Sequence, residues 1–249
     1  MLNIQGLYAG YSGTSVLNDV SLDARSGEVT VIVGPNGCGK STLLKTIVGI
    51  VEKSRGEIWP VDEMTAQERA KTIAYLAQSK QVPDITALRM VLHGRFPYLG
   101  FPRRYRSTDF DIARAALCRM GIGDLEDRPM STLSGGTRQK VYIAMALAQD
   151  TPIILMDEPT TFLDISYQLQ MMEQARMLAD NGKAVVMVLH DISLALQHAD
   201  QLVVMNEGEV VASGEPETVY RSGALDQVFG VRVKRVAVGE TWKYYVEQS

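Results

Sequence analysis

A glycine-rich segment near the N-terminus constrains this chain more than any other part of it. Residues 34–42 read Gly-Pro-Asn-Gly-Cys-Gly-Lys-Ser-Thr, which fits the phosphate-binding loop pattern G-x-x-x-x-G-K-[ST]. The β-branched, apolar run from Val29 to Val33 precedes it, as expected of a buried strand. Apolar residues then recur at helical spacing over residues 43–48, and Gly49 follows in the place of a C-terminal cap. The order of strand, glycine loop and helix predicts a phosphate site in an α/β sheet.

The residue types in this loop match the needs of a nucleoside triphosphate. Glycines let the backbone curl until its N–H groups point at a phosphate, at a helix N-terminus that favours anions. Lys40 supplies a positive charge for the β- and γ-phosphates, and Ser41 a hydroxyl ligand for Mg²⁺. The alternative is an ordinary glycine-rich turn, and the correct flanks argue against it. We expect the nucleotide to contact the whole loop, namely Gly34, Pro35, Asn36, Gly37, Cys38, Gly39, Lys40, Ser41 and Thr42.

A second apolar run ends in paired carboxylates. Residues 153–156 read Ile-Ile-Leu-Met, and Asp157 and Glu158 follow directly. Ligands of open α/β sheets bind at the carboxyl ends of the strands. We therefore expect Asp157 to hold Mg²⁺, directly or through water, and Glu158 to orient and deprotonate the attacking water. A helix-capping acid pair is the alternative, and the phosphate loop upstream makes it less favoured.

Two further side chains have positions that fit the same site. His190 follows the apolar run 184–189, so it lies on the same sheet rim as Asp157. It could donate a hydrogen bond to a γ-phosphate, although a lone histidine is usually structural. Tyr11 comes shortly before the loop. It either stacks on an adenine ring or is an edge-strand aromatic, and the residues alone leave these readings even.

Residues from roughly 82 to 150 read as a helical insertion into a parallel-sheet domain. Apolar spacing predicts helical turns over 85–92, a clean helix over 109–120 and a long helix over 141–148. The segment Leu133–Thr137 offers small residues before the last helix, which favours either a second anion site or a plain serine N-cap with glycines in a turn. The basic group of Arg103, Arg104 and Arg106 is either a solvated face or a contact with acidic side chains or lipid headgroups.

The composition of the chain limits the kinds of partner that we expect it to have. The net charge of −4 over 249 residues argues against a nucleic-acid binder with a broad basic face. Cys38 and Cys118 lack metal or disulfide spacing, which suits a reducing cytosol. The N-terminus lacks signal-peptide regions, and no apolar run approaches the roughly 20 residues that span a bilayer. We expect a soluble protein that meets a membrane only through a partner.

Taken together, the motifs resemble those of the ATP-binding cassette (ABC) ATPase family along almost the whole chain. Residues 34–42 look like the Walker A loop, and residues 153–158 like the Walker B strand with its catalytic glutamate. Residues 133–136 match the signature motif, and residues 161–164 stand in the place of the D-loop. Gln78, at the end of the run 73–76, matches the Q-loop glutamine, and His190 the switch histidine.

The resemblance implies a P-loop NTPase fold, and it also implies which residues form the rest of the nucleotide site. We expect a single ABC ATPase domain over 1–249. Its α/β core, residues 1–81 and 151–249, has a mostly parallel sheet and an N-terminal antiparallel β-subdomain, and residues 82–150 form an inserted helical subdomain. The resemblance also favours Tyr11 as the residue that stacks on adenine. The implied catalytic residues are Glu158, His190, Gln78 and Lys40, and the implied Mg²⁺ ligands are Ser41, Gln78 and Asp157.

The family mechanism needs two copies of the chain. In the family two cassettes meet head to tail in the ATP-bound state, so the resemblance implies that Ser134, Gly135 and Gly136 contact the partner's ATP. Hydrolysis separates the halves and drives attached membrane subunits. The implied partners are transmembrane permease subunits and, indirectly, a substrate-binding protein, with the chain peripheral on the cytoplasmic face of the membrane. Thr137 replaces the usual signature Gln and Phe162 a small D-loop residue, and both departures touch the dimer contact.

Shorter stretches are similar to the ATPase subunits of importers for iron-siderophores, haem and cobalamin. They include residues 16–22, 93–98, 147–149, 157–161 and 188–191. We therefore expect the ATP-hydrolysing subunit of a bacterial importer. The alternative is a soluble ABC ATPase of iron–sulfur cluster assembly, and the segment 94–97 favours the importer. A nucleotide-gated module that does not hydrolyse ATP is a third possibility, against which Glu158 and His190 argue.

Overall fold

The structure is a computed structural model that describes residues 1–78, 82–160, 164–239 and 241–248. Its strands are β1 (Leu2–Tyr11), β2 (Thr14–Ala24), β3 (Val29–Val33), β4 (Lys53–Trp59), β5 (Ile73–Leu76), β6 (Ile153–Asp157), β7 (Ala184–Val188), β8 (Gln201–Asn206), β9 (Glu209–Gly214), β10 (Val231–Val238) and β11 (Thr241–Gln248). Its α-helices are α1 (Lys40–Ile47), α2 (Ala66–Thr72), α3 (Ala87–Leu92), α4 (Ser107–Arg119), α5 (Gly135–Gln149), α6 (Ile165–Asp180), α7 (Ile192–His198), α8 (Pro216–Ser222) and α9 (Ala224–Phe229).

A six-stranded sheet forms the centre of the fold, in the order β5-β6-β7-β3-β8-β9. Neighbouring strands within this sheet are parallel, except for β8 and β9, which form an antiparallel hairpin. The strands β3, β6 and β7 are buried along their whole length, which explains their continuous apolar sequences. Because β5, β6, β7 and β3 are parallel neighbours, their carboxyl ends meet at one edge of the sheet.

A second, three-stranded antiparallel sheet, β2-β1-β4, covers one face of the central sheet together with α1. Side chains alternate between the faces of β3, and Ile32 belongs to the core on this side with Leu43, Leu44 and Ile47 of α1. Val31 points to the opposite face, into the core that the other helices build. The predicted fold class, a mostly parallel P-loop core with an antiparallel β-subdomain and a helical part, is confirmed.

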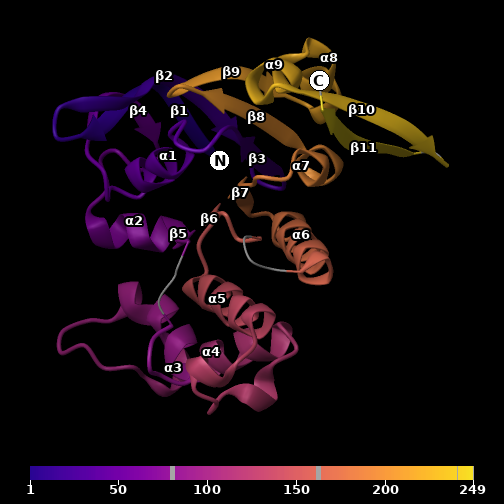
Figure 1. The fold of residues 1–249 in the computed structure, drawn as a ribbon. Helices are drawn as coiled ribbons and strands as arrows, with labels where there is room; N and C mark the ends of the chain where they lie inside the picture. The colour runs from indigo at the N-terminus through magenta and orange to yellow at the C-terminus, as the bar shows by residue number, and fades with distance from the viewer. Residues whose placement is uncertain (79–81, 161–163, 240, 249) are drawn as a thin grey trace.

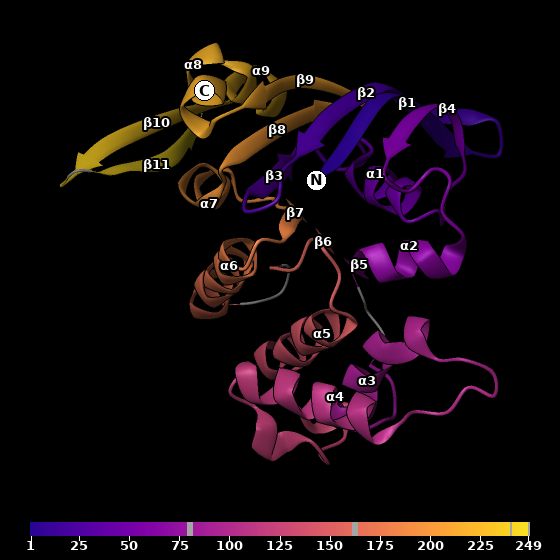
Figure 2. The same cartoon turned by 180° about the vertical axis from the view of Figure 1, so that it is seen from behind.

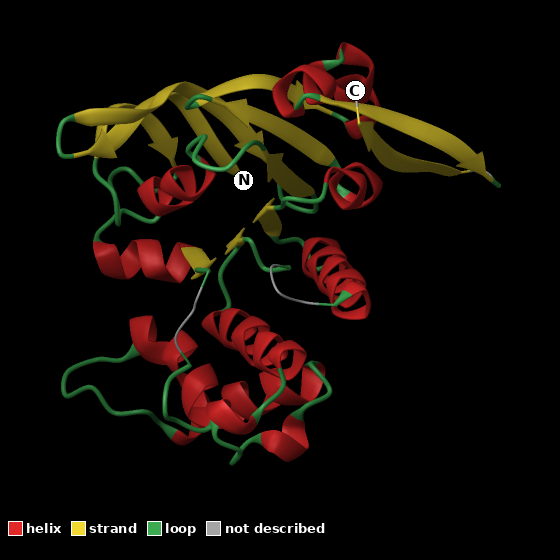
Figure 3. Cartoon of the chain, viewed as in Figure 1, coloured by secondary structure: helices red, strands yellow, loops and turns green. Residues whose placement is uncertain are grey.

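The helices α3, α4 and α5 pack on one another. In Figures 1 and 2 they lie beyond β5 and β6, on the side away from β1, β2 and β4, and Figure 3 shows helices and loops gathered there. The structure places the start of α5 at Gly135, so the prediction that this helix begins at Val141 was wrong. Ser134 is its N-cap and accepts a hydrogen bond from the Thr137 N–H at 3.2 Å. The two glycines in the first turn give no apolar signal, and the predicted start of the helix was therefore placed too late in the sequence. The division at residues 82 and 150 stays a prediction.

A buried ion pair stabilises this group of helices and was not predicted. Arg95, in the 3₁₀ turn His93–Tyr98, has its Nε 3.2 Å from Asp109 Oδ1 and donates from its guanidinium to the Ala148 carbonyl at 2.7 Å. The Tyr98 hydroxyl donates to the Gln149 carbonyl at 2.8 Å. The segment 93–98 therefore contacts residues 147–149, which are the end of α5, and caps the carbonyl groups there.

The Gln149 side chain connects the same helix end to the central sheet. Its amide donates to the carbonyls of Ala70 and Ile73, at 2.7 and 3.0 Å, where α2 passes into β5.

None of the described helices is both long and apolar enough to cross a membrane. The C-terminal hairpin β10–β11 projects from the body of the molecule beside α7, α8 and α9 (Figure 1).

Candidate nucleotide-binding and catalytic site

The predicted phosphate loop connects the end of β3 to the start of α1. Gly37 and Gly39 have φ angles of 82° and 106°, in the left-handed region that favours glycine. A Cβ atom on Gly34 would lie 2.3 Å from the Met205 carbonyl oxygen and 2.6 Å from Cys38 Sγ, so only glycine fits there. The loop is therefore a tight backbone cradle at a helix N-terminus, as an anion site requires.

The Lys40 ammonium group lies within this cradle. Lys40 as a whole is 4 % exposed, and its Nζ donates to the carbonyls of Gly34 and Pro35 at 2.7 and 2.8 Å. The Cys38 side chain is buried, with its Sγ 3.8 Å from the same Nζ. The Cys38 carbonyl accepts a hydrogen bond from the Gly208 N–H at 3.1 Å, which ties the loop to the β8–β9 turn. The cradle thus holds one positive charge against backbone oxygens, where phosphate oxygens could replace them.

Asp157 ends β6 and is held by a hydroxyl group on each carboxylate oxygen. Its Oδ1 accepts from Ser41 Oγ at 2.8 Å, and its Oδ2 accepts from the Tyr75 hydroxyl at 3.0 Å. Tyr75 was not predicted as a site residue, because its only signal in the sequence is a phenol group inside an apolar run, near the end of β5. Burial, followed by the negative charge of Asp157, raises the pKa of Tyr75 above its usual range, so this hydroxyl keeps its proton and remains a donor.

Glu158, the next residue, is held by two nitrogen atoms. His190 Nε2 lies 2.7 Å from its Oε1, and Gln78 Nε2 donates to its Oε2 at 2.6 Å. Its φ of 51° is unusual for a residue with a side chain, and such conformations cluster at active sites. The ends of β3, β5, β6 and β7 thus bring together six of the predicted side chains: Lys40, Ser41, Gln78, Asp157, Glu158 and His190.

The donor set at this edge fits a magnesium ion bound together with phosphates. Ser41 Oγ and the two oxygens of Asp157 lie next to each other, and oxygen atoms are the ligands that Mg²⁺ prefers. Mg²⁺ usually binds through one or two carboxylates plus substrate phosphates. Accordingly, no group of three or more His, Cys, Asp and Glu side chains within the described part of the chain forms a metal site of its own. Gln78 contacts Glu158, and its predicted role as a metal ligand stays a prediction.

The predicted signature residues lie on a different element, at the start of α5. Ser134 Oγ is 2.9 Å from Thr137 Oγ1, so the threonine that departs from the family pattern contacts the N-cap directly. The Tyr167 ring of α6 covers Gly136 so closely that a Cβ there would lie 2.1 Å from a ring carbon. Ser134 and Gly135 are exposed. Of the predicted D-loop, residues 161–163 with Phe162 lie outside the described part of the chain, and Asp164 is the N-cap of α6.

Tyr11 ends β1, directly before the turn into β2. Its side chain is 47 % exposed, so it has free ring surface on which a base could stack. Its role in stacking stays a prediction.

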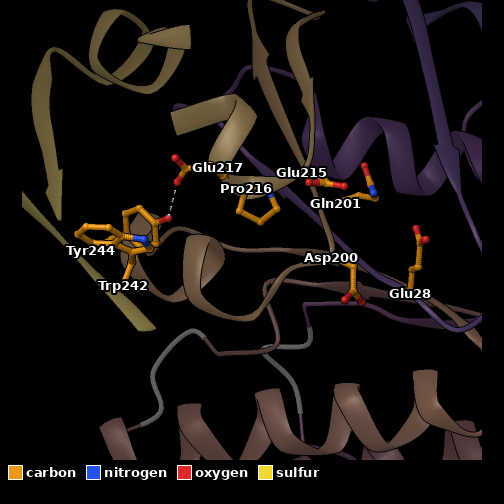
Figure 4. A pocket seen from close by; sticks show the side chains of 8 residues that line it. All are labelled: Glu28, Asp200, Gln201, Glu215, Pro216, Glu217, Trp242 and Tyr244. Carbon is orange, nitrogen blue, oxygen red and sulfur yellow. Dashed lines mark hydrogen bonds between the residues drawn. The ribbon is translucent and has the colours of Figure 1, made fainter. Parts of the chain in front are cut away.

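A pocket of about 720 Å³ lies at the other end of the central sheet. Figure 4 shows the side chains that line it: Glu28, Asp200, Gln201, Glu215, Pro216, Glu217, Trp242 and Tyr244. They come from the residues directly before β3 and β8, from the start of β8, from the N-cap and first turn of α8, and from β11. Asp200 accepts from Arg176 at 2.6 Å, and Glu217 from Arg221 and Arg235. Because it lies at the amino ends of the parallel strands, this pocket is not the predicted nucleotide site.

Comparison with known proteins agrees with the geometry. The family model described as "ABC transporter" matches residues 17–161. The ferric enterobactin transport ATP-binding protein FepC of Escherichia coli is 38% identical over 232 residues, which cover 91% of this chain and 86% of FepC. The hemin import ATP-binding protein HmuV of Rhodococcus jostii is 42% identical over 235 residues, which cover 92% of this chain and 80% of HmuV.

A solved structure, described as an inward-facing conformation of a metal-chelate type ABC transporter, has the same fold. It is 27% identical with a TM-score of 0.86, over 98% of this chain and 95% of that one. The names of these relatives refer to transport and import, so they favour the importer over the iron–sulfur assembly ATPase.

Proposed function

The chain belongs to the ABC transporter family, and from that premise we propose that it is the ATP-hydrolysing subunit of a bacterial importer. The proposed cargo is an iron-siderophore, haem or cobalamin-type substrate, the class that the relatives' names describe. The assignment of ATP hydrolysis rests on the adjacent pair Asp157 and Glu158. Each of these carboxylates accepts from two donors, at the edge of the sheet where the phosphate loop begins.

In the proposed mechanism the two carboxylates have different tasks. The cradle of residues 34–42 and Lys40 bind the phosphates, and Ser41 and Asp157 hold Mg²⁺, which supplies charge neutralisation when bound. Glu158 orients the attacking water and accepts its proton. His190 and Gln78 each contact one oxygen of Glu158, so they fix the plane of the carboxylate that must face the water. Gln78 would also reach the metal when the nucleotide binds.

A second copy of the chain completes the proposed site. Ser134 and Gly135 are exposed at the N-terminus of α5, where backbone N–H groups without helical partners favour an anion. We propose that Ser134, Gly135 and Gly136 contact the ATP bound by the partner copy in an ATP-dependent homodimer. The dimer would bind transmembrane permease subunits at the cytoplasmic face of the membrane. A substrate-binding protein would be an indirect partner, through the permease.

A pull-down from native membranes tests the importer assignment. Tagged protein is captured from detergent-solubilised membranes, and its partners are identified by mass spectrometry. A polytopic permease in stoichiometric yield is the expected result, and its binding protein would lead to the substrate. Only soluble partners, with the protein absent from the membrane fraction, would favour the assembly ATPase and leave the ATP chemistry intact.

Replacement of Tyr11 tests the adenine contact. We expect Tyr11→Ala to weaken ATP binding by about 1–3 kcal/mol, the usual contribution of a base stacked on an aromatic ring. Tyr11→Phe keeps the ring and serves as the matched control, with affinity close to that of the wild type. Equilibrium titration with ATP measures both variants. Equal affinity of the alanine variant and the wild type would leave Tyr11 with a structural role only, at the end of β1, which is the middle strand of its sheet and not the edge strand that the sequence suggested.

A further inference from the structure

Tyr75 donates a hydrogen bond in the paired-carboxylate site, and the proposed mechanism gives it no role. Its hydroxyl lies 3.0 Å from Asp157 Oδ2, while Ser41 Oγ lies 2.8 Å from Oδ1. Asp157 is 3 % exposed, so its orientation depends on protein groups rather than on bulk water. A carboxylate oxygen has two lone pairs. One hydrogen bond on each oxygen therefore leaves each of them able to bind a metal or a metal-bound water.

The position of Tyr75 in the sheet explains how its hydroxyl reaches this carboxylate. In the parallel pair β5–β6, Tyr75 is paired with Leu155, two residues before Asp157, so the three side chains share one face of the sheet. The Tyr75 ring packs against the apolar core on the α1 side. A rigid ring anchored in this core places its hydroxyl at the end of the neighbouring strand, and packing alone would not need that oxygen.

We propose that Tyr75 is a positioning residue for Asp157, which fixes the plane of the carboxylate for the Mg²⁺ ion that accompanies ATP. The inference rests on the proposed function of the site. Ser41 donates to only one oxygen of Asp157, and its hydroxyl would also be needed as a ligand of the metal. Tyr75 comes from β5, a different strand from Asp157, and not from the loop that would bind the phosphates. Its hydrogen bond would therefore hold Asp157 in the same orientation with and without the ion.

The test separates metal binding from nucleotide binding. The variant is Tyr75→Phe, which keeps the ring in the core and removes only the hydroxyl. Mn²⁺ replaces Mg²⁺ as a spectroscopic probe, and its binding in the presence of a non-hydrolysable ATP analogue is followed by electron paramagnetic resonance. We expect the affinity for Mn²⁺ to fall on the order of 10–100-fold, as is usual when a group that orients a metal ligand is lost. Binding of the analogue in excess EDTA should be unchanged.

Two controls make the result specific. Tyr105→Phe, in the segment between the 93–98 turn and α4, should bind Mn²⁺ like the wild type. In an Asp157→Asn background, Tyr75→Phe should cause no additional loss, because the residue acts through Asp157. If Tyr75→Phe lowers the melting temperature strongly, Tyr75→Leu is measured at a temperature where it is folded, and the same loss is expected.

The outcomes distinguish this inference from the assignment of the site. Wild-type Mn²⁺ affinity in folded Tyr75→Phe, with normal binding of the analogue, would overturn the role of Tyr75 and leave the nucleotide site in place. An equal further loss in the Asp157→Asn background would also overturn it, because the effect would then bypass the carboxylate. If the wild type itself binds no analogue in EDTA or with Mn²⁺, the proposed function fails first.

Discussion

The Lys40→Ala protein is expected to lose ATP binding. The Lys40 ammonium group is buried in the phosphate cradle, where its Nζ donates two hydrogen bonds to backbone carbonyls at 2.7 and 2.8 Å. A bound triphosphate would receive those hydrogen bonds in place of the carbonyls. Hydrogen bonds to charged groups contribute about 1.5–3 kcal/mol each. Two of them correspond to about 3–6 kcal/mol, or on the order of 10²–10⁴ in Kd.

The measurement is equilibrium binding of ATP with a matched lysine control. Lys45 lies in the last turn of the same helix, α1, and is only partly buried. Lys45→Ala should bind ATP like the wild type, since its charge lies at the opposite end of the helix. Thermal unfolding of both variants checks that the fold is retained. Wild-type affinity in folded Lys40→Ala would remove the assignment of residues 34–42 as a phosphate-binding loop.

Most of the site could be predicted because its residues follow strands. In a parallel sheet the carboxyl ends of neighbouring strands lie on one edge, so a polar residue directly after an apolar run has a known place. Asp157, Glu158 and His190 all carry this signal, and the structure brings the last two to 2.7 Å from each other. A different signal, the helical spacing of residues 43–48, placed Gly49 at the end of this helix, and Gly49 follows the C-cap residue Val48 with a φ of 78°.

The contacts that could not be predicted depend on distance in three dimensions. Alternation along each strand does not give the register between β5 and β6, and it is this register that puts Tyr75 and Asp157 on one face and lets the hydroxyl reach the carboxylate. Arg95 and Asp109 are separated by an irregular segment, whose path the sequence pattern does not define. The start of α5 was placed too late because glycines carry no periodic signal, although Ser134 is a typical N-cap residue.

The second large effect is expected at the catalytic carboxylate. Glu158→Gln keeps the size of the side chain and removes the negative charge that accepts a proton from water. Loss of a general base typically lowers the rate about 10²–10⁴-fold, so we expect ATP turnover to fall by that factor. ATP binding should persist, because the phosphates are held by residues 34–42 and not by Glu158. With hydrolysis blocked, the ATP-bound homodimer should accumulate.

Glu158→Gln changes the contacts of the side chain as well as its charge. Both Glu158 oxygens contact a nitrogen, from His190 and from Gln78, and an amide offers only one oxygen to accept. The variant therefore loses one of these contacts as well as the charge. Steady-state turnover and light scattering with ATP measure the two consequences, rate and dimer. Glu209→Gln, on the exposed face of β9, is the matched control and should behave like the wild type.

Turnover at the wild-type rate in Glu158→Gln would show that a different group activates the water. A slow variant that remains monomeric with bound ATP would separate the two halves of the proposal, because the base would stand while the contact of Ser134 with the partner's ATP would not.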